Sequence, residues 1–286
     1  MQQWRQYRLI DILDKIIDYR GKTPQKTDAG IPLITAKIIK DGRILPPNEF
    51  IAESNYDKWM VRGIPHEGDV VLTVEAPLGE VAQLGNEKIA LAQRVVTLRG
   101  KEGVLDNTFL KYFLMSQVGQ ARLKARETGT TVTGIKQSEL REILIDCPNY
   151  EHQLQIASIL RAIDNKIENN RKINDNLEQQ ASSLLSDWIS TYPCRTYKLS
   201  DICKYVSAKF DTGNLTSQNY ISTENMLPNK KGIVDASNIP TGKVTHFKVD
   251  DILIANIRPY FQKIWKADIN GGCSTDVLCI RANIEL

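Results

Sequence analysis

The chain has 286 residues, of which 42% are hydrophobic, and its 37 lysines and arginines against 34 aspartates and glutamates give a net charge of +3. This length and composition suffice for two folded domains with substantial cores. A charge so near balance excludes binding to nucleic acid through a global positive field, so any DNA contact has to come from local basic patches.

The cysteines and histidines of the chain indicate no metal-binding, disulfide or catalytic site. Five cysteines lie far apart without a CxxC pair, and three histidines are scattered, so we expect no metal site, no disulfide framework and no catalytic triad. The N-terminus lacks a secretory pattern, and 18 apolar residues nowhere follow one another. The sequence therefore predicts a cytoplasmic protein with reduced thiols and no membrane partner.

Residues 1–148 predict a strand-rich domain, and the whole chain an α+β fold. Short runs rich in Ile, Val, Leu and Thr, such as IPLITAKII and GDVVLTVEAPLGEVAQL, lie between Gly, Pro and Asn residues and are typical of strands. From Asn107 to Ala125, apolar residues recur at helical spacing. They predict one amphipathic helix that Asn107 caps.

Residues 149–191 predict a single long helix, since no Gly or Pro occurs in residues 151–190. Its seam positions alternate in steps of four and three, the a/d pattern of a coiled coil. They are Ile156, Leu160, Ile163, Ile167, Asn170, Asn174, Leu177, Ala181, Leu184 and Trp188. The two asparagines either fix register and partner number or mark a solvated, frayed point. A seam of this length needs a partner helix, from this chain or from another subunit.

Residues 192–286 predict a partial second copy of the first domain. Three blocks recur in order, at an offset that drifts from 190 to 182. Residues 7–12 recur as 197–202, residues 68–72 as 250–254, and residues 95–99 as 277–281. The second copy ends at Leu286 without a counterpart of the segment after Arg99, so we expect it to be incomplete.

Two motifs carry a resemblance to a known family. They are Asp18–Pro24, DYRGKTP, and the stretch Gly129–Ile135, GTTVTGI, followed by Leu140, Leu144, Ile145, Pro148, Glu151, Gln153, Ile156, Ala157, Leu160 and Asp164. The chain resembles the DNA-specificity subunits of type I restriction-modification systems. The resemblance implies two target-recognition domains in tandem, each followed by a long helix, with the two helices packed antiparallel as a spacer.

The resemblance also implies a function without catalysis in this chain. Each recognition domain would read one half of a split sequence in double-stranded DNA, and the helices would dock methyltransferase subunits. S-adenosylmethionine would bind those subunits, which modify adenine N6, whereas ATP and Mg would belong to a separate restriction subunit. The sequence agrees, because Pro46-Pro47 lacks the Asn/Asp-Pro-Pro-Tyr/Phe context of an adenine methyltransferase.

Candidate DNA-binding residues follow from side-chain chemistry, since cations and small hydroxyls suit phosphates while Arg, Lys, Gln and Asn read base edges. The candidates are Arg20, Lys22, Thr23, Thr35, Lys37, Lys40, Arg43, Gln93, Arg94, Thr130, Thr131, Thr133 and Lys136. For the loops at 20–23 and 130–136 a purely structural turn is an equal alternative. Arg94 aligns with Asp276 in the second copy, so the pair 93–94 is either specificity-determining or merely exposed.

Two other functional classes stay open at this point. The first is a stand-alone DNA-binding protein that uses the coiled coil to dimerise, by self-association through the long helix. The second is an enzyme of unknown type in which Glu75 and Asp69, near the ends of a strand, act as acid and base. Incubation of the purified chain with DNA and S-adenosylmethionine is a discriminating test, because the specificity-subunit interpretation predicts no methylation by this chain alone.

Overall fold

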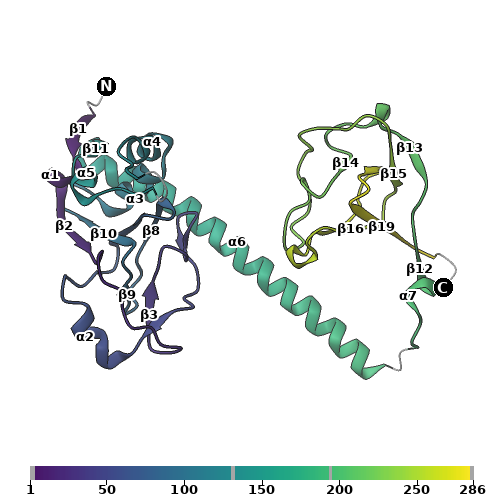
Figure 1. Cartoon of the computed structure of the whole chain (residues 1–286), viewed down its shortest axis with the longest axis horizontal. Coiled ribbons are helices and arrows are strands. Elements are labelled where there is room, and N and C mark those ends of the chain that lie inside the picture. The colour runs from purple at the N-terminus through teal and green to yellow at the C-terminus, as the bar shows by residue number, and fades with distance from the viewer. Residues whose placement is uncertain (1–3, 130–132, 193–194, 284–286) are drawn as a thin grey trace. The chain divides into compact units, whose positions relative to one another are not determined.

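A computed structural model describes residues 4–129, 133–192 and 195–283 of the chain (Figure 1). The chain divides into two compact units, Met1–Ala181 and Ser182–Leu286, which are treated separately below. Both contain strands and helices, and one helix is very long, so the predicted α+β class is confirmed.

The first unit is built around an antiparallel sheet in the order β2 (Leu13–Asp18), β10 (Val95–Gly100), β7 (Val70–Val74) and β8 (Leu78–Gln83). Every residue of β7 is buried, as its continuous run of Val, Leu and Thr predicts for a central strand. The helices α3 (Asn107–Met115) and α4 (Gln117–Ala125) pack on β8. Small elements complete this layer: β1 (Arg5–Arg8) pairs with β11 (Leu144–Cys147), beside α1 (Leu9–Ile12) and α5 (Gln137–Arg141).

A second small sheet gives the first unit another hydrophobic core. Its central strand β3 (Ile31–Ile34) is antiparallel to β6 (Phe50–Ile51) and parallel to β9 (Ala90–Leu91). A hairpin of β4 (Ile39–Lys40) and β5 (Arg43–Ile44) and the short helices η1 (Glu53–Asn55) and α2 (Tyr56–Trp59) adjoin it. Its core side chains come from these strands, from α2 and from one face of the larger sheet, through Ile17, Val71, Ala82 and Val95.

The prediction of one helix from Asn107 to Ala125 is wrong in two respects. Ser116 ends α3 and caps α4, since its hydroxyl accepts the N–H of Gly119 at 3.1 Å. The cap of α3 is Asp106, whose carboxylate accepts the N–H of Phe109 at 2.8 Å. The Asn107 side chain instead accepts the N–H of Gly100 at 2.7 Å, so it joins the helix to the sheet.

The predicted long helix is present as α6 (Tyr150–Thr191), whose 42 residues span about 60 Å. The buried Gln153 anchors its first turn, because the amide donates to the carbonyl oxygens of Val104 and Pro148. Farther along, the carboxylate of Asp164 accepts hydrogen bonds from Lys111 at 2.7 Å and Tyr112 at 2.8 Å. These bonds outweigh the effect of burial and keep the pKa of Asp164 below its ordinary value. From residue 169 to the end of α6, every side chain is exposed.

The second unit repeats the sheet order of the first. Its strands β12 (Cys203–Tyr205), β19 (Val277–Ala282), β16 (Ile252–Ala255) and β17 (Ile264–Lys266) pair in that order, after α7 (Leu199–Ile202). A second sheet contains β13 (Lys209–Asp211), β15 (Lys243–Phe247), β18 (Gly271–Cys273) and β14 (Tyr220–Ile221). The short helices η2 (Thr212–Asn214) and η3 (Pro259–Phe261) lie in its loops.

An ion pair between a buried aspartate and a half-buried arginine recurs at the same place in the sheets of both units. In the first unit Arg99 donates to Asp69 at 2.7 Å, and in the second Arg281 donates to Asp251 at 2.6 Å. Burial opposes ionisation of Asp251, but the bonds from Arg281 and from a backbone N–H outweigh it and hold its pKa below the ordinary value. The pair ties the start of one strand to the end of its neighbour, which explains why these residues occur in two of the recurring blocks.

Candidate nucleic-acid interface

Five of the predicted DNA-binding residues line one cleft of about 260 Å³ in the first unit. We call it the Gln93 cleft. Its lining residues are Thr23, Pro24, Lys26, Leu33, Thr35, Ala36, Lys37, Glu49, Ala76, Ala92, Gln93 and Arg94. They come from the loop after β2, the end of β3, the segment before β6, the β7–β8 turn and the segment before β10.

The parallel pairing of β3 with β9 explains why these segments meet. Ile34 lies opposite Leu91 at the last positions of the two strands, and the N–H of Ala92 donates to the carbonyl of Ile34 at 3.0 Å (Figure 1). Parallel strands end at the same edge of a sheet. The residues that follow them, Thr35 to Lys37 and Ala92 to Arg94, therefore lie side by side at that edge.

The polar side chains of the cleft are held in place at different depths. The Thr23 hydroxyl donates to the Oε1 atom of half-buried Gln93 at 3.1 Å, and Arg94 lies 3.8 Å from Glu75. Thr35 is 7% exposed, and its hydroxyl has no hydrogen-bond partner among the described residues. Thr35 thus forms the floor of the cleft, whereas the amide of Gln93 and the guanidinium of Arg94 stand at its mouth.

Two lysines share one carboxylate at the rim. Glu49 lies 2.6 Å from the ammonium group of Lys26 and 3.4 Å from that of Lys37. The hydrogen bond from Lys26 is the main reason that the pKa of Glu49 lies below its ordinary value. One carboxylate cannot neutralise two cations, so the rim keeps positive charge, and the Lys37 side chain is 75% exposed.

Comparison with known proteins decides the family. The family model of the type I restriction modification DNA specificity domain matches residues 1–179, more than half of the chain. The chain belongs to this family. Its resemblance to type I specificity subunits is thereby confirmed.

The individual relatives agree with this assignment. The MjaIX specificity subunit of Methanocaldococcus jannaschii is 33% identical over 122 residues, which cover 43% of this chain and 28% of that protein. The MjaVIII specificity subunit of the same organism is 25% identical over 191 residues, covering 65% and 45% respectively. The matched segments thus span less than half the length of these curated relatives. The type I S subunit from M. genitalium has a similar fold, with a TM-score of 0.54 at 20% identity, covering 100% of this chain and 74% of that one.

Three further predicted loop residues of this specificity domain, Lys22, Thr133 and Lys136, are exposed, and Lys136 lines a separate pocket with Arg20 and Arg62. Lys22 is exposed just before Thr23. Thr133 and Lys136 are exposed on the segment that follows the Gly129 loop, and Gly134 forms a backbone bridge with Glu75, next to Ala76. Thr130 and Thr131 lie outside the described residues.

Arg20 has an intramolecular role in the specificity domain. Its guanidinium binds both carboxylate oxygens of Asp18 and donates to the carbonyl of Ile135 at 2.6 Å. It thereby joins the loop after β2 to the segment before α5. This is the structural alternative that the sequence left open, and DNA contact by Arg20 stays a prediction.

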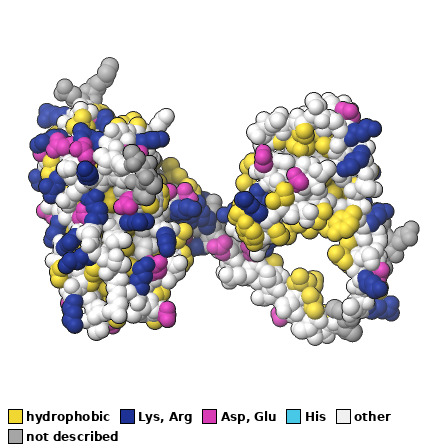
Figure 2. Space-filling model, in the orientation of Figure 1, with side chains coloured by type: hydrophobic (Ala, Val, Ile, Leu, Met, Phe, Trp, Pro, Cys, Tyr) yellow, Lys and Arg dark blue, Asp and Glu magenta, His cyan; other side chains and the backbone are white. Residues whose placement is uncertain are grey.

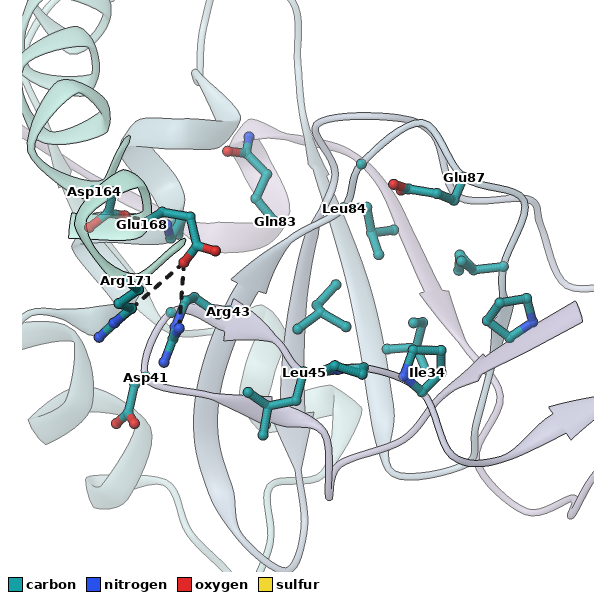
Figure 3. Close-up of a pocket in the computed structure, with 18 of the residues that line it drawn as sticks. Ile34, Asp41, Arg43, Leu45, Gln83, Leu84, Glu87, Asp164, Glu168 and Arg171 are labelled. Carbon is teal, nitrogen blue, oxygen red and sulfur yellow. Dashed lines mark hydrogen bonds and ion pairs between the residues drawn. The ribbon is translucent and has the colours of Figure 1, made fainter. Parts of the chain in front are cut away.

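Lys40 and Arg43 are not brought to the Gln93 cleft. Both lie on the β4–β5 hairpin, and Arg43 and Asp41 line a second, larger cavity of about 750 Å³ beside α6. Figure 3 shows Arg43 directed toward Glu168 of α6, 3.5 Å away, with Leu45, Ile34 and Leu84 farther along the groove. We call this cavity the hairpin groove. Arg43 thus forms an ion pair with Glu168 of α6, and its contact with DNA remains a prediction.

Sequence reasoning missed three residues that shape the interface. Lys26 lies in the same polar loop as Lys22, and that proximity was a usable signal. The sequence carries no such signal for Glu49 and Arg62, because their roles depend on partners that are distant along the chain. Arg62 donates to the carbonyl oxygens of Asp18 and Arg20 and so fixes the loop before the cleft.

The structure argues against the acid–base pair considered from the sequence. Asp69 precedes β7 and Glu75 follows it, which separates them by roughly 20 Å at the rise of a strand. Asp69 is also buried in its ion pair with Arg99, and Glu75 faces Arg94. Within residues 4–129, 133–192 and 195–283 there is no group of three His, Cys, Asp or Glu side chains able to hold a metal ion. No helix in those ranges is long and apolar enough to cross a membrane.

Proposed function

We propose that this chain is the non-catalytic DNA-recognition subunit of a type I restriction-modification complex. Its first unit reads one half of a bipartite site and so directs adenine methylation and restriction by partner subunits. The observation that supports this most strongly is the convergence of Thr23, Thr35, Lys37, Gln93 and Arg94 in one cleft of a specificity domain.

The groups at the mouth of the Gln93 cleft match the edges of bases. The amide of Gln93 offers an acceptor and a donor side by side, the pattern that pairs with adenine N6 and N7 in the major groove. The guanidinium of Arg94 offers two parallel donors for guanine O6 and N7. Two such groups on adjacent residues suit the reading of neighbouring base pairs.

The lysines around the cleft would position the duplex without reading it. Lys22, which precedes Thr23 of the cleft, and Lys37, which lines it, are exposed, so their ammonium groups can reach phosphates. Figure 2 shows that Lys and Arg side chains on the visible face of the first unit are interspersed with Asp and Glu. Contact with DNA is therefore local, as the net charge of +3 predicts.

The chemistry would be supplied by other subunits. Methyltransferase subunits would dock on α6 and bind S-adenosylmethionine, and a restriction subunit would use ATP and Mg. The side chains of α6 beyond residue 168 are exposed and leave room for such partners. We also propose that the complex assembles and acts in the cytoplasm.

Co-purification with the methyltransferase encoded beside this chain, followed by sequencing of adenine methylation in host DNA, tests the proposal. We expect a bipartite methylated motif, one half of which changes when residues 1–148 are exchanged for those of another specificity subunit. The alternative, a stand-alone DNA-binding protein, predicts tight DNA binding without any methyltransferase. A soluble chain that leaves methylation unchanged would overturn the proposal.

A further inference from the structure

The second unit reproduces the sheet edge on which the Gln93 cleft is built. In the first unit, the N–H of Ala92 donates to the carbonyl of Ile34 where the parallel strands β3 and β9 end. In the second, the N–H of Ser274 donates to the carbonyl of Ile221 at 2.8 Å, where the parallel strands β14 and β18 end. Parallel strands present the residues that follow them at one edge, so this edge of the second unit is the counterpart of the cleft.

A second backbone hydrogen bond fixes which residues correspond. The N–H of Val74, at the end of β7, donates to the carbonyl of Arg94 at 3.0 Å. The N–H of Asn256, just after β16, donates to the carbonyl of Asp276 at 2.9 Å. Donor and acceptor both recur at the offset of 182 that the repeated blocks show. Asp276 therefore occupies in the second unit the position that Arg94 occupies in the first.

The side chains at the two edges differ in what they offer to DNA. Thr275 stands where the first unit has Gln93, so a hydroxyl replaces an amide. Asp276 stands where the first unit has Arg94, so a carboxylate replaces a guanidinium and the sign of the charge is reversed. Both Thr275 and Asp276 are exposed. The two units thus share one backbone frame but present opposite hydrogen-bonding groups on it.

The carboxylate of Asp276 is available to a ligand. Arg94 lies 3.8 Å from Glu75, whereas no lysine, arginine or histidine in the part of the chain that the structure describes forms an ion pair with Asp276. Burial is the main reason that the pKa of Tyr220 is raised, and the nearby charge of Asp276 raises it further. Asp276 therefore lies close to β14 and exposes an unpaired carboxylate at this edge.

An unpaired carboxylate that faces DNA discriminates strongly among the bases. It accepts hydrogen bonds and cannot donate them, so it repels phosphate oxygens, the O6 and N7 atoms of guanine and the O4 atom of thymine. Adenine offers the donor N6, but its acceptor N7 lies beside it. Cytosine offers the N4 amino group as a donor and has no acceptor of its own in the major groove. Cytosine is therefore the base that fits this group.

We propose that Asp276 is a specificity-determining residue of the second unit, which accepts a hydrogen bond from the N4 group of a cytosine. This inference rests on the proposed function, since it requires that the second unit reads the other half of the bipartite site. The contact should favour cytosine over the other bases by roughly 5- to 150-fold. Arg94 selects guanine at the same place in the first unit, so the two half-sites differ at the corresponding base pair.

A change of base preference tests the proposal in the full chain, co-expressed with the methyltransferase encoded beside it. Asp276→Asn keeps the size of the side chain and gives it a donor beside an acceptor, the pattern that pairs with adenine N6 and N7. Sequencing of adenine methylation in host DNA should show one base pair change from C·G to A·T. This base pair should lie in the half of the motif that an exchange of residues 1–148 leaves unchanged. Asp276→Ala should accept all four bases at that position and keep the rest of the motif.

Asp268→Asn is the matched control, because it removes the same charge from an exposed aspartate that precedes β18, whereas Asp276 follows this strand. It should leave the motif unchanged. An unchanged motif in both Asp276 variants would overturn the inference and leave the proposed function standing. Equal loss of methylation at every site, without a change of base preference, would also overturn it, because it would show a merely structural role. Absence of bipartite methylation with the unsubstituted chain would overturn the inference and the proposed function together.

Discussion

Replacement of Gln93 by alanine is the sharpest test of the cleft as a reader of DNA sequence. Gln93 is half-buried and its Oε1 atom is oriented by the Thr23 hydroxyl at 3.1 Å, so its amide is presented in a fixed direction. A bidentate contact between such an amide and adenine contributes about 1–3 kcal/mol of discrimination. We therefore expect Gln93→Ala to weaken binding to the cognate half-site by roughly 5- to 150-fold.

The orienting hydrogen bond should have a smaller effect of its own. Thr23→Val removes one neutral hydrogen bond, which contributes about 1 kcal/mol, and should weaken cognate binding by roughly 5-fold. Because the two side chains act through one contact, the double variant should lose little more than Gln93→Ala alone. Gln179→Ala, on the exposed face of α6, is the matched glutamine control and should bind normally.

Fluorescence anisotropy at one fixed salt concentration measures these effects on duplexes that carry each single base change in the methylated motif. Gln93→Ala should lose its preference at one base pair and keep it at the others. Equal weakening on every duplex would show that Gln93 only supports the loop. Unchanged affinity would show that the cleft does not face DNA; either result would refute the reasoning above.

Three further outcomes follow from the structure. Asp69→Asn removes the buried carboxylate that pairs with the half-buried guanidinium of Arg99, and it should cost about 3 kcal/mol in the free energy of unfolding, measured by urea denaturation. Glu53→Gln, in an exposed ion pair, should leave the urea midpoint unchanged, and equal effects of the two variants would contradict this account. Because the pKa of Asp251 in the folded chain lies below its ordinary 3.8, its contribution to stability is complete above that pH and is lost as the pH falls through the lowered value. Acid unfolding followed by circular dichroism should thus be less steep in Asp251→Asn. Lys37→Ala should weaken binding to all sequences alike and reduce the slope of log affinity against log salt by about 0.9, and an unchanged slope would place Lys37 away from phosphate.

The long helix and the repeat were predictable because their signals are local or repeat within the chain. The segment has forty residues without Gly or Pro, and its apolar residues recur at alternating spacings of four and three. This pattern is typical of a helix. The break at Ser116 was missed, because the apolar pattern continues across it and only the hydroxyl bond to Gly119 shows a new cap. Helix ends are decided by such single bonds.

The sequence predicted which residues belong to the candidate site, but it did not predict where in the structure they lie. Side-chain chemistry selected Thr23, Gln93 and Arg94, but it selected Arg43 by the same criterion, and that side chain pairs with Glu168 on α6. Arg20 likewise has the composition of a phosphate-binding residue, yet it bonds to Asp18. A cation in a sequence does not reveal which carboxylate lies beside it in space.

The sequence by itself determined the class of fold, the long helix, the recurring blocks and the family, because each depends on patterns along the chain. Only the tertiary structure decided which candidates share a surface. The parallel pairing of β3 with β9 brings Thr35 next to Gln93, whereas the position of the β4–β5 hairpin places Arg43 beside α6. Pairings between distant segments are set by the burial of both cores together, and no local pattern encodes them.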